Sequence, residues 1–139
     1  MSGSAIGVLA AMDEEVRRLR EGLADARVER TGRRDYLHGV IAGHPVVVAF
    51  SRWGKSAAAA TATTMIERFG IDRLIFTGVA GAADPVLGIG DVVVASSLVH
   101  HDLDARPIIR RFEVPLLDIV EIPTDPELRR LAREAGEAV

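Results

Sequence analysis

The sequence predicts an α/β fold with a mixed, largely parallel sheet flanked by helices. Two observations carry this prediction: short apolar runs rich in β-branched residues, and intervening segments whose apolar residues recur every three or four positions. Strands that alternate with helices in this way are typical of a sheet covered by helices. With 139 residues, 48% apolar and 27% charged, the chain fits one globular unit, so we expect a single α/β domain over residues 1–139.

The chain opens with a strand followed by a helix. Residues 5–11 are apolar on both faces, which is typical of a fully buried strand. Residues 13–24 follow with helical spacing of their apolar side chains. Asp13, Glu14 and Glu15 fill the first turn, where negative charge complements the helix dipole.

A pair of strands and a second helix come next. Strands are expected over 36–42 and 45–50, joined by a tight turn at Gly43-His44, since the second is continuous and β-branched. The Ala-rich segment 56–69 predicts a helix, and Gly70 ends it as a C-cap glycine.

The second half is less regular. Residues 74–76 predict a strand that runs into a glycine-bearing loop at 77–81, and residues 91–99 predict another strand. Residues 102–123 contain three prolines and are expected to be irregular. Residues 125–138 predict an amphipathic helix. An alternating fold normally continues after such a helix, so we expect the fold to be incomplete at its C-terminus.

Composition and charge exclude several classes of protein. The chain has no Cys, which excludes disulfides and thiolate metal sites. Its net charge of −3 gives no electrostatic argument for binding nucleic acid.

No apolar run approaches the roughly 20 residues of a membrane span. The start, Met1-Ser-Gly-Ser, has no basic region before its apolar stretch, so we expect a cytoplasmic protein. Adjacent His100 and His101 point to opposite faces of a strand, so a metal site is not predicted. No cofactor is expected.

Two segments follow predicted strands where an open sheet binds its ligand. The acids of Met12–Glu15 come directly after the first strand, and Thr77–Gly81 follows a later one. Taken singly, the acids are typical of a helix cap, and the glycine-bearing loop is typical of a tight turn. Together they favour a site with a carboxylate and an uncharged cradle, where small residues allow a ligand to approach the backbone.

A phosphate-binding loop is an alternative for residues 49–56. Ala49-x4-Gly-Lys-Ser56 matches a relaxed form of that pattern between a strand and a helix. Two observations speak against a phosphate-binding loop. Ala49 belongs to the β-branched strand, and the bulky Arg52-Trp53 stands where small residues would let the backbone curve around a phosphate. The simpler interpretation is that Gly54-Lys55-Ser56 starts the helix.

Five segments, in this order and spacing, resemble the 5'-methylthioadenosine/S-adenosylhomocysteine nucleosidases of the nucleoside phosphorylase superfamily. They are Ile6–Val16, Ser51-x-x-Gly54-Lys55, Thr77-Gly-x-Ala-Gly81, Gly90–Val94 and His101-Asp-x-Asp104. The combination is far more specific than any single motif.

The resemblance implies hydrolysis of an N-glycosidic bond, with adenine as a product. The transition state is oxocarbenium-like, so a water must be activated under the anomeric carbon. Glu15 matches the family's carboxylate for that role, as general base. The resemblance also implies residues that line the ribose and base, and one beside the 5'-substituent. The residues that line the ribose and base are Ala11, Met12, Val79, Ala80 and Gly81. The residue beside the 5'-substituent is Trp53.

The sequence departs from the family pattern at three places. Val79 stands where the family commonly has Ser, and Arg52-Trp53 replaces Gly-Ile. The family domain is also longer. Its ribose-binding Glu-Met-Glu and the Ser-Asp that protonates the purine are expected after residue 139. We therefore expect the N-terminal portion of a longer nucleosidase domain, with weak or no turnover on its own.

The resemblance implies a purine nucleoside ligand, a role in methionine salvage and a homodimer with residues 102–107 near the partner. Membrane and nucleic-acid partners are not expected. Two alternatives stay open beside the phosphate loop. One is a phosphorylase of the same superfamily, for which Arg52 is a candidate phosphate ligand. The other is a fragment that binds nucleosides without catalysis.

Overall fold

A computed structural model describes residues 4–137 and contains two compact units. The first extends to Gly81 and the second starts at Ala82. The prediction of a single domain over the whole chain stays a prediction.

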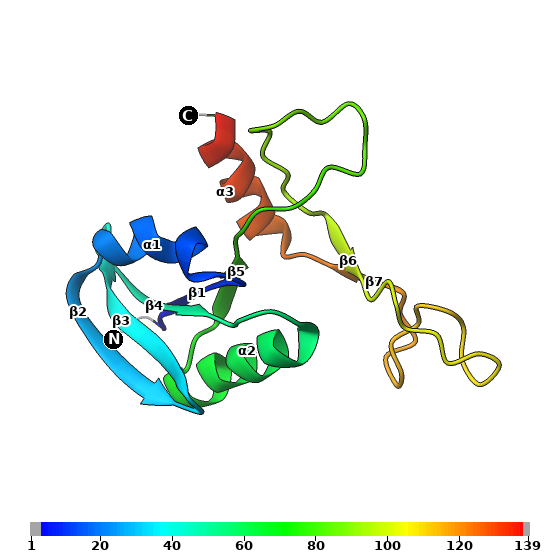
Figure 1. Cartoon of the computed structure of the whole chain (residues 1–139), viewed down its shortest axis with the longest axis horizontal. Helices are drawn as coiled ribbons and strands as arrows, with labels where there is room; N and C mark the ends of the chain where they lie inside the picture. The colour runs from blue at the N-terminus through cyan, green and yellow to red at the C-terminus, as the bar shows by residue number, and fades with distance from the viewer. Residues whose placement is uncertain (1–3, 138–139) are drawn as a thin grey trace. The chain divides into compact units, whose positions relative to one another are not determined.

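The first unit is built on a five-stranded mixed sheet with the strand order β2-β3-β4-β1-β5. β1 pairs in parallel with β4 and β5, whereas β3 pairs antiparallel with β2 and β4 (Figure 1). The elements of this unit are β1 (Ile6–Ala10), α1 (Asp13–Glu21), β2 (Ala24–Thr31), β3 (Arg34–Ile41), β4 (His44–Phe50), α2 (Lys55–Phe69) and β5 (Arg73–Phe76). The predicted mixed α/β sheet is confirmed.

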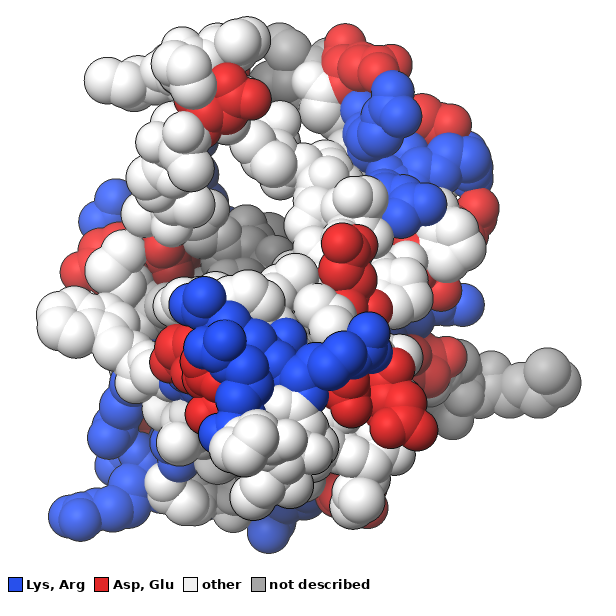
Figure 2. All heavy atoms as spheres, turned by 90° about the vertical axis from the view of Figure 1, so that its right-hand side faces the viewer, with Lys and Arg blue, Asp and Glu red and all other residues white. Residues whose placement is uncertain are grey.

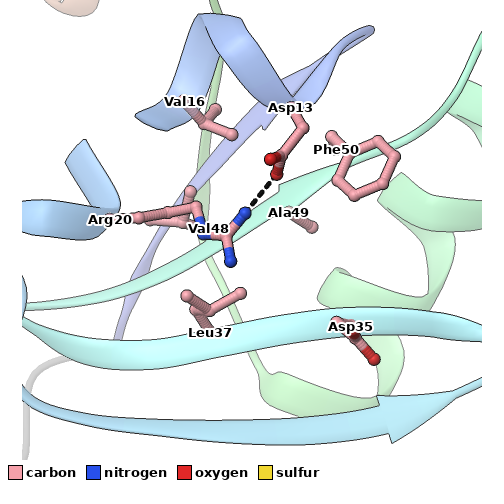
Figure 3. A pocket seen from close by; sticks show the side chains of 8 residues that line it. All are labelled: Asp13, Val16, Arg20, Asp35, Leu37, Val48, Ala49 and Phe50. Atoms are coloured by element: carbon pink, nitrogen blue, oxygen red, sulfur yellow. Dashed lines mark hydrogen bonds and ion pairs between the residues drawn. The ribbon is translucent and has the colours of Figure 1, made fainter. Parts of the chain in front are cut away.

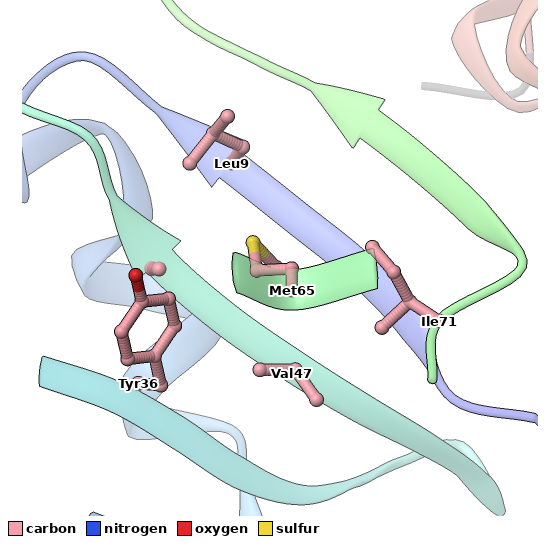
Figure 4. Close-up of a cluster of buried hydrophobic side chains, with 6 residues drawn as sticks. Leu9, Tyr36, Val47, Met65 and Ile71 are labelled. Carbon is pink, nitrogen blue, oxygen red and sulfur yellow. The ribbon is translucent and has the colours of Figure 1, made fainter. Parts of the chain in front are cut away.

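The two helices cover opposite faces of the sheet, because side chains alternate along each strand. Val47 and Ala49 of β4 pack with Met65 of α2, in a cluster that also contains Leu9 and Tyr36 (Figure 4). On the other face, Val16 of α1 packs in a cluster with Val8, Ala10, Val46 and Val48. The central strands β1 and β4 are thus buried on both faces, as their continuous apolar runs predict.

One strand was not predicted, and the first helix is shorter than expected. α1 ends at Glu21 rather than Ala24, because the backbone N–H of Gly22 closes the last turn on the carbonyl of Arg18 and that of Leu23 donates to the carbonyl of Arg20. The chain then forms β2, a charged edge strand that pairs only with β3. Its Arg and Glu side chains carry no apolar alternation, so the pattern gave no strand signal there.

Tight turns join β2 to β3 and β3 to β4. Gly32 and Arg33 both have positive φ, as do Ala42 and Gly43. Two consecutive positive-φ residues suit the right-handed twist of a hairpin. The second turn therefore lies one residue earlier than the predicted Gly43-His44.

His38 of β3 and His44 of β4 differ in exposure, although they lie on neighbouring strands. The His38 side chain is 13% exposed and packs edge-on against Phe69, with ring centroids 4.6 Å apart. His44 is exposed. The reason is register, since His38 pairs with Val47, on the face that α2 covers.

The second unit contains a short hairpin and a helix. β6 (Ser97–Val99) pairs antiparallel with β7 (Glu121–Pro123), and α3 spans Pro126–Glu137. The Asp125 carboxylate accepts the N–H of Leu128 at 2.8 Å and caps α3. Residue 138, the predicted end of this helix, lies outside the described residues.

The predicted strand over 91–99 is wrong except at its end, since only Ser97–Val99 is a strand. Val92 and Val93 are extensively exposed. Their β-branched side chains favour extended backbone, but a strand also needs a neighbouring chain to complete its hydrogen bonds. β7, in contrast, was not predicted although it is paired. It has only three residues, too few to show an alternation of apolar and polar side chains. Among the described residues no helix is long and apolar enough to cross a membrane.

Candidate active site

The three parallel strands of the first unit end at the same edge of the sheet. β1 ends at Ala10, β4 at Phe50 and β5 at Phe76. The backbone ladder continues one step beyond, because Ser51 N–H donates to the carbonyl of Ala10 at 2.7 Å and Thr77 N–H donates to that of Leu9 at 2.9 Å. The loops that follow the three strands are thereby brought together, at the edge where open α/β sheets bind ligands.

The carboxylate of Glu15 lies in this group of loops and accepts three backbone N–H groups. Its Oε2 accepts from Ala11 at 3.0 Å and from Met12 at 2.9 Å, while its Oε1 accepts from Val79 at 2.9 Å. The first two donors follow β1 and the third follows β5. Glu15 thus connects two of the three strand ends, and the structure brings the predicted acid and the predicted glycine loop together.

Helix capping explains only part of this arrangement. A Glu at the third position of a helix that accepts the N-cap N–H, here that of Met12, is half of a capping box. The bond from Val79 lies outside that motif, because Val79 is 64 residues further along the chain. Gly78 also packs against the carboxylate so closely that an added Cβ would lie 2.7 Å from Oε1. The loop after β5 is therefore fitted to Glu15.

The surroundings of Glu15 favour its ionised form. The bond from Val79 N–H lowers the pKa of Glu15 most, partial burial opposes it, and the bonds from Met12 and Ala11 lower the pKa further. A carboxylate that accepts several N–H groups is stabilised as the anion. At neutral pH Glu15 is thus a fixed negative charge at the strand ends.

The loop after β4 is held in an unusual conformation. Arg52 has a φ of 70°, a region that residues with a Cβ rarely adopt. Its guanidinium donates to the backbone carbonyl of Arg33, in the β2–β3 turn, at 2.8 Å. The buried Ser51 hydroxyl donates to the carbonyl of Arg52 at 2.7 Å. Gly54, with a φ of 99°, then caps α2, which begins at Lys55, one residue before the predicted start.

The remaining predicted site residues lie on these same loops. Ala11 and Met12 are half-buried beside Glu15. Trp53 and Val79 are each 80% exposed, and Ala80 and Gly81 are also exposed. The first unit thus presents the predicted residues at one sheet edge with open surfaces.

Sequence reasoning did not commit to three groups that shape the site. Ser51 was quoted only as part of a motif, although it is 1% exposed and bonded to β1. Gly78 lay within the glycine loop without a role of its own. The carbonyl of Arg33 carries no sequence signal, since any residue has one. The buried Ser and the glycine could have been found from their position directly after strands.

The first unit has two hollows whose linings do not include Glu15. One, beside α1, has a volume of about 30 Å³, the size of one water, and the Arg20–Asp13 ion pair lies across it (Figure 3). A wider cleft of about 660 Å³ is lined by residues at the starts of the parallel strands, such as Ala5, Pro45 and Gly70. Neither is lined by Glu15, and the wider cleft lies at the strand ends opposite to those that usually bind ligands.

Charges of both signs are interspersed over the face shown in Figure 2. Among the ion pairs of the second unit, Arg130 pairs with Glu127 and Glu134, and Arg106 pairs with Asp104. Within residues 4–137 no group of three or more His, Cys, Asp or Glu side chains is placed to hold a metal ion.

Known proteins resemble this chain over nearly its whole length. An aminodeoxyfutalosine nucleosidase of Campylobacter jejuni is 38% identical over 136 residues, which are 95% of this chain and 58% of the relative. A 5'-methylthioadenosine/S-adenosylhomocysteine nucleosidase of Bacillus cytotoxicus is 39% identical over 71% of this chain and 43% of its own. The crystal structure of such a nucleosidase from Neisseria meningitidis, in complex with methylthio-immucillin-A, superposes with a TM-score of 0.93.

That structure is 31% identical and is matched over 98% of this chain and 59% of its own. The matched part thus covers about half the length of these nucleosidases, from 43% to 59%. The model of the phosphorylase superfamily matches residues 5–139. Fold, sequence and family model agree, and the chain belongs to the phosphorylase superfamily.

Proposed function

We propose that the whole protein hydrolyses the N-glycosidic bond of 5'-methylthioadenosine or S-adenosylhomocysteine, releasing adenine, with Glu15 activating the attacking water. The observation that supports this most is the carboxylate of Glu15, held at the strand ends by N–H groups from two loops. The relatives' names point to the same reaction class.

The hydrogen bonds of Glu15 leave room for a water. A carboxylate offers about four lone-pair sites. Oε2 accepts two N–H groups and Oε1 accepts one, which leaves a site on Oε1. A water bound there loses a proton to the carboxylate as its oxygen attacks the anomeric carbon, and the adenine leaves with the bond electrons.

The test is adenine release from 5'-methylthioadenosine by the whole protein. Glu15→Gln keeps the size of the side chain but removes the base, so release should fall by a factor of roughly 100 or more. Glu14→Gln is the matched control, since Glu14 is exposed on the same turn of α1. Full activity of the Glu15 variant would reject the role assigned to it.

Phosphorolysis is the nearest alternative, and the position of Arg52 speaks against it. A phosphorylase needs cationic groups at the site for its phosphate. The Arg52 guanidinium is instead bonded to the carbonyl of Arg33, on the β2–β3 turn. Rates measured with and without inorganic phosphate separate the two reactions, and we expect no dependence on phosphate.

The 5'-substituent is a second open point within the same proposal. One relative is named for aminodeoxyfutalosine and another for methylthioadenosine and adenosylhomocysteine. Trp53, exposed on the loop after β4, is the residue we assign to the 5'-group. Turnover of all three nucleosides under one condition would rank them.

A binding role without catalysis is the remaining alternative for these 139 residues. We expect them to bind purine nucleosides with weak or no turnover, because the acid that protonates the purine is expected after residue 139. Calorimetric titration with adenosine analogues, followed by assay for adenine, distinguishes binding from hydrolysis. Magnesium-dependent ATP binding that is lost in Lys55→Ala would instead support the phosphate-loop hypothesis.

We also propose a homodimer that acts in the cytoplasm in methionine salvage. Large exposed apolar side chains are often covered in a protein interface. The second unit carries several, among them Ile89, Val92, Ile108 and Leu116. Sedimentation analysis of the whole protein tests the dimer, and a monomer at micromolar concentration would contradict it.

A further inference from the structure

One peptide group links the loop after β4 to the carboxylate of Glu15. The carbonyl of Ala10 and the N–H of Ala11 belong to the same planar peptide group. The carbonyl accepts the N–H of Ser51 at 2.7 Å, and the N–H donates to Glu15 Oε2 at 3.0 Å. A change in the position of Ser51 is therefore transmitted to Glu15 without any intervening side chain.

The loop that holds Ser51 is itself tethered at its next residue. Arg52 Nη2 donates to the carbonyl of Arg33, 19 residues earlier in the chain, at 2.8 Å. The Ser51 hydroxyl donates to the carbonyl of Arg52 at 2.7 Å. Arg52 adopts a φ of 70°, a left-handed conformation that is unfavourable for a residue with a Cβ. That conformation persists because the guanidinium is anchored to the β2–β3 turn.

We infer that Arg52 is a positioning residue: its bond to the Arg33 carbonyl fixes the loop after β4, and through Ser51 and the Ala10–Ala11 peptide group it fixes Glu15 and directs Trp53 outward. The inference rests on the proposed function for its importance to catalysis. Its structural content can be tested without turnover.

Hydrogen bonds in a chain strengthen one another, which gives the link its effect. When the Ala10 carbonyl accepts a bond, the peptide polarises and its N–H becomes a better donor. The groups that lower the pKa of Glu15 are all backbone N–H groups, that of Ala11 included. Loosening Ser51 weakens one of these donors, so the carboxylate should become easier to protonate.

The test compares Arg52 variants of the 139-residue chain by two measurements on the free protein. Carbon NMR follows the titration of the Glu15 carboxyl, and fluorescence anisotropy follows Trp53, the single Trp of the sequence. Arg52→Met keeps the side-chain length but cannot donate. We expect it to raise the titration midpoint of Glu15 and to lower the anisotropy of Trp53, because the untethered loop moves more freely.

Three further variants make the result decisive. Arg52→Lys restores a donor and should recover part of both effects. Arg52→Gly removes the strain of positive φ, so it keeps the fold if the Met variant unfolds, yet it still lacks the tether. Arg33→Asn keeps the accepting carbonyl and tolerates a φ of 60°, so neither measurement should change.

Unchanged values of both quantities in Arg52→Met and Arg52→Gly would overturn the inference. A lower anisotropy of Trp53 with an unchanged titration midpoint of Glu15 would overturn it as well. Arg52 would then hold the loop in the wild type without any effect on the carboxylate. A shifted midpoint, together with no adenine release from 5'-methylthioadenosine by the whole protein, would support the link while the proposed function fails.

Discussion

The carboxylate of Glu15 and the backbone N–H of Val79 form a 2.9 Å hydrogen bond between the start of α1 and the loop after β5. It closes a connection over 64 residues, and it is the largest cause of the lowered pKa of Glu15. The pairing of β5 with β1 makes it possible, because the last bond of that ladder, from Thr77 to Leu9, sets the position of the loop.

The first prediction concerns the glycine that makes room for this bond. In Gly78→Ala the new Cβ would lie 2.7 Å from Glu15 Oε1, so either the loop or the carboxylate must move. We expect a loss of about 1–3 kcal/mol in the free energy of unfolding, as for other overpacked sites. Gly81→Ala is the control in the same loop, since nothing lies within 4 Å of its Cβ. Chemical denaturation measures both, and equal losses would contradict the fit described for Gly78.

The second prediction is the pH dependence that Glu15 imposes on stability. Its pKa lies below the usual 4.5 in the folded chain, so the unfolded chain binds more protons in acid. The stabilisation is therefore complete above pH 4.5 and is lost as the pH falls through the folded pKa. Unfolding free energies measured from pH 6 down to pH 3 should fall more steeply for the wild type than for Glu15→Gln. Parallel curves would show that the three N–H bonds do not favour the anion.

The central strands could be predicted from the sequence because burial on both faces leaves an uninterrupted apolar run, as in Val46-Val47-Val48. The strand β2 could not, because an exposed edge strand is held by its turn and its pairing rather than by apolar alternation. The site divides in the same way. Glu15 and the glycine loop were each recognisable beside a strand end, but their contact depends on which strands are neighbours. The Arg52–Arg33 bond depends on main-chain geometry, for which no residue type is a signal.

The third prediction concerns His38, whose contribution to the stability of the fold is also lost in acid. Folding favours the charged form of Glu15, but it favours the neutral form of His38. Burial under Phe69 lowers the pKa of His38 most, the charge of Arg27 lowers it further, and Glu29 opposes both. Glu29 is already engaged, since its Oε1 accepts from Arg68 at 2.7 Å while its Oε2 lies 4.0 Å from His38 Nε2. A neutral His38 is thus favoured by folding.

The contribution of His38 is therefore complete above its ordinary pKa of 6.5 and is lost as the pH falls below that value. His38→Leu removes the titration, so its unfolding midpoint should change less between pH 7.5 and pH 5 than that of the wild type. His44→Gln, on the exposed start of β4, should follow the wild-type curve. A His38 variant that follows it too would show that the imidazole is not desolvated.

The fourth prediction separates the 5'-group from the purine. Trp53 is 80% exposed on the β4 loop, so its indole is available to a ligand rather than committed to the core. An aromatic contact is worth about 0.5–1.5 kcal/mol, so Trp53→Ala should weaken binding of 5'-substituted adenosines by roughly two- to tenfold. Adenine itself should bind the variant as it binds the wild type, because it has no 5'-group. Trp53→Phe keeps a ring and should lie between the two. Calorimetry gives all the affinities, and equal losses for adenine and its nucleosides would place Trp53 beside the base instead.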